Sequence, residues 1–132
     1  MVKGHEMASS KAAQWEDIAE RFHEEAKSRK KVLAYHFDPH QRGWLAGMQL
    51  GHSTAASFAV AAKAENKGIP AELRHPMTDA ELFYAFVDYL LSEVSRKEDE
   101  LDAEIKEEFY EDDELTEYRK GRLVGLNNLT HI

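Results

Sequence analysis

The chain contains no cysteine, which excludes disulfide frameworks, thiolate zinc sites and cysteine nucleophiles. It also lacks a long hydrophobic run. The most apolar stretch, residues 44–62, is interrupted by Gln49, His52 and Ser53, whereas a membrane-spanning helix needs about 18 or more apolar residues. Residues 1–10 have no apolar core of the kind found in a signal peptide. These absences predict a cytoplasmic protein that does not enter a membrane.

Prolines are few, and they divide the chain into long helical blocks. With 132 residues, 42% of them hydrophobic and 32% charged, the chain can form one core under a highly charged surface. We expect a flexible leader over 1–9 and a single helical domain over 10–132. The first helix is predicted over about 10–35 from apolar residues that recur at helical spacing: Trp15, Ile18, Phe22, Ala26 and Leu33.

Strong signals mark both ends of the second helix. Asp38 followed by proline is a favoured helix start, and Gln41 completes a capping box. Gly68, followed by an isoleucine and Pro70, indicates the stop, so the helix is predicted to end at about residue 67.

The third helix is predicted to begin at Thr78, which forms a capping box with Glu81. Its apolar stripe suggests that it is the central core helix, continuing unbroken through the acidic residues that follow, although a break near Ser95 is the alternative. A short last helix is predicted over about 113–126. No strand-like alternation is present, so we predict an all-α fold, an irregular bundle of three long helices and one short C-terminal helix. The stripe consists of Leu82, Phe86, Leu90 and Val94.

Glycines at a spacing of four are the most specific feature. Each glycine destabilises a helix interior by about 1 kcal/mol relative to alanine, so three on one face require a compensating contact. Close packing against the first or third helix is the favoured interpretation, and a homodimer interface or a groove for a partner helix is the alternative. The predicted packing glycines are Gly43, Gly47 and Gly51, together with Gly121 and Gly125 in the last helix.

The two glycine segments resemble each other. Residues 42–48 match 120–126 in a base, two glycines, a leucine and a large apolar residue. This is a weak internal repeat, or two helices that pack on the same neighbour. The run from Tyr118 to Leu126 resembles a Tyr-x-x-Gly-Arg-x-x-Gly-Leu pattern of many small helical proteins of bacteria and their phages, and the resemblance implies a bacterial or phage origin.

The negative charge is concentrated in one segment. Residues 93–117 contain thirteen acids and three bases, a net charge of −10, while the whole chain has −8. Such a segment repels nucleic-acid phosphates and favours a basic protein partner, although a long helix with a solvated outer face has a similar composition.

We therefore expect a small acidic protein-interaction module that binds a host protein, such as one with a basic nucleic-acid-binding surface. A phage-encoded inhibitor or a mimic of the charge of DNA is the specific form of this expectation. Acids and two aromatic anchors would make the contact, with no direct binding of nucleic acid. A structural subunit of a homo-oligomeric assembly is an alternative. The predicted partner-binding residues are Glu107, Glu108, Phe109, Tyr110, Glu111, Asp112 and Asp113.

Catalysis has weaker support. Glu20 and His23 have the Glu-x-x-His spacing of di-iron bundles, but a second pair on a facing helix is missing, so no metal site and no cofactor are predicted. The acids after His23 and the run from Ala80 to Leu91 resemble the all-α MazG-like nucleotide pyrophosphohydrolases, which hold Mg²⁺ with clustered carboxylates. In their Glu-x-x-Asp motif, however, Ala85 stands where the glutamate is expected before Asp88.

Overall fold

The computed structural model describes residues 2–32, 38–103, 105 and 112–128, with side chains for 11–31, 38–103, 105 and 112–127. This part of the chain is helical and contains no strand, which confirms the all-α class. None of its helices is long and apolar enough to span a membrane. The elements are α1 (Val2–Val32), α2 (Pro39–Lys63), the 3-10 turn η1 (Ala71–Leu73), α3 (Asp79–Arg96), α4 (Glu98–Ala103) and α5 (Asp112–Asn128).

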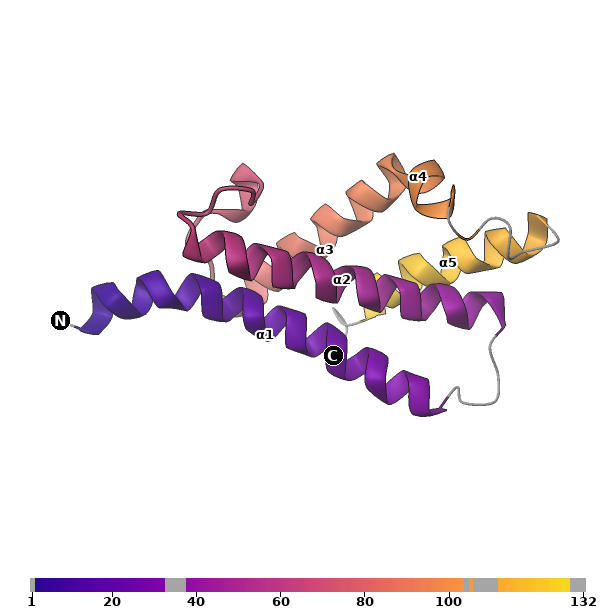
Figure 1. Ribbon diagram of the computed structural model, residues 1–132, viewed down its shortest axis with the longest axis horizontal. Coiled ribbons are helices and arrows are strands. Elements are labelled where there is room, and N and C mark those ends of the chain that lie inside the picture. Colours follow the sequence, from indigo (N-terminus) through magenta and orange to yellow (C-terminus); the bar gives the residue numbers. More distant parts are fainter. Residues whose placement is uncertain (1, 33–37, 104, 106–111, 129–132) are drawn as a thin grey trace.

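Helices α1 and α2 form an antiparallel hairpin (Figure 1). Helix α1 begins at Val2, so residues 2–9, expected as a leader, are continuous with the predicted helix. It ends at Val32, and Leu33 and Tyr35 at its predicted end lie outside the described residues. The Nδ1 atom of His52 lies 2.9 Å from the carbonyl oxygen of Ala19, which ties the middle of α2 to α1.

Helix α2 starts as predicted and stops earlier. The Asp38 side chain accepts from the backbone N–H of Gln41, and the Gln41 side chain faces the backbone N–H of Asp38 in return. The helix ends at Lys63 because the chain already turns at Glu65, which has a φ of 62°, and the Asn66 N–H reaches back to the Ala61 carbonyl at 2.9 Å. This is a Schellman-type end with a glutamate in the left-handed position that glycine prefers.

Helix α3 supplies the aromatic part of the core. Thr78 and Glu81 form the predicted capping box, and all four residues of the predicted stripe are buried. Phe86 meets Trp15 of α1 edge-on, with ring centroids 5.1 Å apart, and Phe22 stacks on Phe83 at 5.9 Å. These large side chains fill the space between α3 and the α1–α2 hairpin.

The third helix does not continue through the acidic segment, so the expected continuity is wrong. Helix α3 ends at Arg96 and the chain turns at Lys97, close to the predicted alternative break. A straight helix would carry the next residues away from the core, whereas the turn brings α4 back beside α5. The turn thereby buries Asp102, which is 1% exposed.

Helix α2 rather than α3 occupies the centre of the molecule, because it contacts α1 on one side and α5 on the other along much of its length. Helix α5 is longer than the predicted short helix and runs in the same direction as α2 (Figure 1). The glycines of α2 explain why this helix, and not α3, lies at the centre. They allow neighbouring backbones to come close, whereas the phenylalanines of α3 keep its axis at a distance.

Candidate functional site

The glycines of α2 and α5 lie at a contact between two helix backbones. A Cβ atom added at Gly43 would lie 1.9 Å from the carbonyl oxygen of Tyr118, and one added at Gly47 would lie 2.5 Å from that of Arg122. Conversely, a Cβ at Gly121 would lie 1.9 Å from the His40 carbonyl oxygen. No side chain fits at these positions unless the helices move apart.

This contact is reciprocal. Gly43 faces the backbone of Tyr118, and Gly121 faces the backbone of His40. In the internal repeat, position 43 corresponds to 121 and position 40 to 118, so the two contacts are equivalent. Gly125 faces the Trp44 backbone as Gly47 faces that of Arg122. The two segments therefore pack on each other, in parallel and with approximate two-fold symmetry, rather than on a shared neighbour.

Gly51 belongs to a different contact. An added Cβ there would lie 2.5 Å from the ring of Phe22 in α1, so this glycine faces the first helix, as expected for intramolecular packing. The neighbour of Gly43 and Gly47 is instead α5, which was not among the expected partners. Because the chain covers these glycines itself, they leave no open groove for a partner helix.

Beside the glycine contact lies a buried ion cluster that the sequence analysis missed. Asp102 of α4 accepts from Nη1 of Arg122 at 2.9 Å and from Nε of Arg119 at 2.6 Å. Arg119 also lies 3.4 Å from Glu98. The hydrogen bond to Asp102 raises the pKa of Arg119 above its usual value. Thus one acid of the acidic segment holds α4 to α5 instead of facing solvent.

Arg122 is only partly satisfied by this cluster. Its side chain is 4% exposed, yet Nε and Nη2 have no hydrogen-bond partner. A buried donor without a partner costs about 1–3 kcal/mol, and more in a charged group. The guanidinium carbon lies 5.5 Å from the centre of the Tyr118 ring, a contact that adds attraction but accepts neither N–H.

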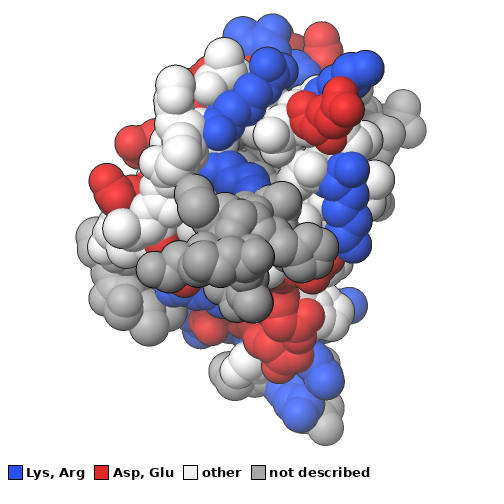
Figure 2. Space-filling view, turned by 90° about the vertical axis from the view of Figure 1, so that its left-hand side faces the viewer, with Lys and Arg blue, Asp and Glu red and all other residues white. Residues whose placement is uncertain are grey.

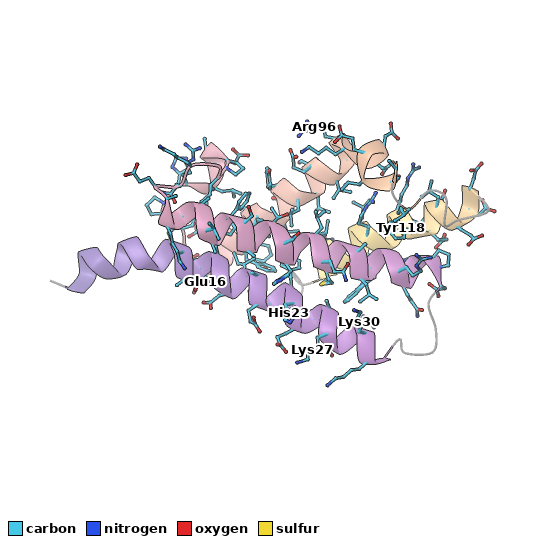
Figure 3. The ribbon with its side chains drawn as sticks, in the orientation of Figure 1. Glu16, His23, Lys27, Lys30, Arg96 and Tyr118 are labelled. Atoms are coloured by element: carbon cyan, nitrogen blue, oxygen red, sulfur yellow. The ribbon has the colours of Figure 1, made fainter. Side chains whose placement is uncertain are left out.

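Two adjoining grooves run over α2 near this cluster. One, the arginine groove, has a volume of about 430 Å³ and is lined by residues that include Ala46, Gln49, Leu50, Leu101, Tyr118 and Arg122. The other, the apolar groove, has a volume of about 270 Å³ and lies between α2, α3 and α4, with Leu90, Val94 and Glu93 in its wall. Leu50 and Leu101 belong to both grooves. Figure 3 places Tyr118 where α5 runs beside α2.

The predicted partner-binding residues fall in two groups. Glu107, Glu108, Phe109, Tyr110 and Glu111 lie outside the described residues. Asp112 and Asp113 are exposed in the first turn of α5, where negative charge is favoured by the helix dipole.

Nearby bases are already paired with other acids. Arg96 and Lys97 bind Glu93, and the contact with Arg96 is the main reason that the pKa of Glu93 is lowered. Lys120 binds Glu117 at 3.2 Å. Within the described part of the chain, several acids of α4 and of the first turn of α5 therefore have no ion-pair partner. We call this set the acidic surface: Asp99, Glu100, Asp112, Asp113 and Glu114.

The described side chains visible at the N-terminal end of the molecule carry charges of both signs. Figure 2, which views that end, shows acidic and basic side chains interspersed. Helix α1 carries a basic last turn, and its Lys27 and Lys30 lie across α2 from Arg96 at the end of α3 (Figure 3).

Residues that suggested a metal or an enzyme do not come together. Asp88 is exposed on α3, and Glu24 is exposed on α1. No group of three or more metal-ligating side chains is found among the residues that the structure describes. Comparison with known protein families, with curated proteins and with solved structures finds no match to this chain.

The buried cluster left one signal in the sequence. In the internal repeat Arg122 aligns with Trp44, and Trp44 is a large residue beside the glycine face. That alignment indicates a buried environment for the arginine. Nothing in the sequence indicated that Asp102 would be its partner, because that pairing depends on the turn at Lys97.

Proposed function

We propose that the protein is a binding module that takes a basic segment of a partner protein on its acidic surface. The observation that supports this function is the set of acids on α4 and α5 that form no ion pair among the described residues, because the bases around them are bound to Glu93, Asp102 and Glu117. A surface with an excess of charge of one sign accelerates the encounter with an oppositely charged partner and disfavours wrong partners. The same charge repels nucleic acid.

The apolar groove supports an amphipathic partner. It borders α4 and presents aliphatic side chains, among them Leu50 and Leu101, and Leu101 lies on the same helix as Asp99 and Glu100. A segment with alternating basic and apolar positions would bury its apolar side chains there while its bases meet the carboxylates. Since nucleic-acid-binding proteins carry such basic segments, an inhibitor that imitates the charge of DNA is the specific form of this proposal.

Two charge variants test the function. The first neutralises the acidic surface by D99N, E100Q, D112N, D113N and E114Q. The second is a matched control that neutralises five acids elsewhere: D17N, E20Q, E24Q, E65Q and E72Q. Both raise the net charge equally. The probe is a labelled amphipathic peptide of lysine and leucine, and binding is followed by fluorescence anisotropy at several salt concentrations.

We expect the acidic-surface variant to bind the peptide at least about tenfold more weakly than the control variant. About 0.3 kcal/mol for each exposed pair gives about 1.5 kcal/mol for five. Affinity should fall with added salt, and labelled duplex DNA should not bind. An equal loss in both variants would show that only the net charge matters and would refute a localised binding surface.

A further inference from the structure

The arginine groove contains a second recognition element, independent of the acidic surface. The guanidinium of Arg122 has one nitrogen, Nη1, on Asp102. The other two, Nε and Nη2, lie on one edge of the planar group, are buried and have no partner. This edge donates two parallel N–H groups and is the one that pairs with both oxygens of a carboxylate or with two oxygens of a phosphate.

We infer that the arginine groove binds a small organic oxyanion, a carboxylate or a phosphate ester, through the Nε–Nη2 edge of Arg122. The groove volume of about 430 Å³ is within the range of small-molecule sites. Its wall combines Arg122 with aliphatic and aromatic side chains from three helices, Leu50, Leu101 and Tyr118. Such a lining suits a ligand with one charged head and an apolar body.

Buried polar groups in folded proteins are nearly always hydrogen-bonded, so an unpartnered buried guanidinium edge calls for a partner. Asp102 does not supply it, because its two oxygens lie on Nη1 of Arg122 and Nε of Arg119 and not on the Nε–Nη2 edge. Gln49, whose side chain is exposed beside the groove, carries an amide that can donate to the same anion. The bond to Asp102 fixes the guanidinium in place, so the edge is preorganised for a ligand.

Titration of the full-length chain, labelled with ¹⁵N and followed by NMR, tests this inference. The Nε–H signal of Arg122 reports on the buried, unpartnered edge, and the Nε–H signal of Arg119, already bonded to Asp102, is the internal control. The probes are benzoate and phenyl phosphate, with chloride as the simple anion. We expect a saturable shift of the Arg122 signal with benzoate or phenyl phosphate while the Arg119 signal stays in place.

The outcomes are distinct. Saturation by phenyl phosphate alone identifies a phosphate site, and saturation by benzoate identifies a carboxylate site. No shift at Arg122, parallel shifts of both arginines, or an equal response to chloride would overturn the inference. The variant R122K keeps the charge but loses the paired donors, so we expect at least tenfold weaker binding, whereas K120Q, an exposed change in the same helix, should bind like the original chain. If R122K does not fold, the titration of the unmodified chain still decides the question, and none of these results depends on the acidic surface.

Discussion

Replacing glycine by alanine at the α2–α5 contact should destabilise the protein, although alanine favours a helix. At Gly43 and Gly121 the new Cβ would lie 1.9 Å from a backbone carbonyl oxygen of the other helix. A side chain in the way could rotate, but a helix backbone cannot. Relief of the clash therefore requires the two helices to move apart by about 1 Å, which opens the packing along the whole interface.

Two opposing effects set the magnitude. Alanine gains about 1 kcal/mol over glycine in a helix interior. Overpacking costs typically about 1–3 kcal/mol, and a rigid obstacle places these positions at the upper end of that range. We expect a net loss of about 1–2 kcal/mol for G43A and for G121A. The losses for G47A and G125A should be smaller, because the corresponding distances are 2.5 and 2.6 Å.

Urea unfolding of the single and double variants measures these losses. Because the contact is reciprocal, G43A and G121A should cost nearly the same. The double variant should cost clearly less than the sum of the two, since helices already separated by one Cβ accommodate the second. A gain in stability of about 1 kcal/mol for either single variant would mean that only the higher helix propensity of alanine affects stability. That result would refute the backbone contact.

Three further predictions concern other parts of the fold. D102N should destabilise the protein by about 3–5 kcal/mol, because it leaves the buried Arg122 without its counter-charge, and D102L combined with R122M should cost less; urea unfolding compares them. E65G should stabilise the protein by about 1 kcal/mol by removing the strain of a positive φ, and an unchanged melting temperature would contradict that reading of the α2 end. Hydrogen bonds from the Thr78 backbone and hydroxyl lower the pKa of Glu81, so its stabilisation is present above the pKa of the unfolded chain and is lost as the pH falls through the folded value. The variant E81Q should therefore show a weaker loss of stability in acid than the original chain, measured by thermal unfolding across that range.

Local signals determined most of the secondary structure. The capping boxes at Asp38 and Thr78 fix two helix starts, because each depends on side chains only three residues away. The apolar stripe from Leu82 to Val94 fixes the buried face of α3, because helical periodicity is a property of the backbone. The spacing of the glycines likewise indicated a close helix contact before the partner was known.

Long-range choices were decided only by the tertiary structure. Residues near Lys97 could continue a helix, and the turn there is favoured by the burial of Asp102 against α5, a contact between positions distant in sequence. The partner of Gly43 could have been any helix that tolerates close approach, and α5 fits because its own glycines reciprocate. The acidity of residues 93–117 is a property of the sequence. The fold decides which of these acids bind an arginine and which are left at the surface, because it determines which arginines lie beside them.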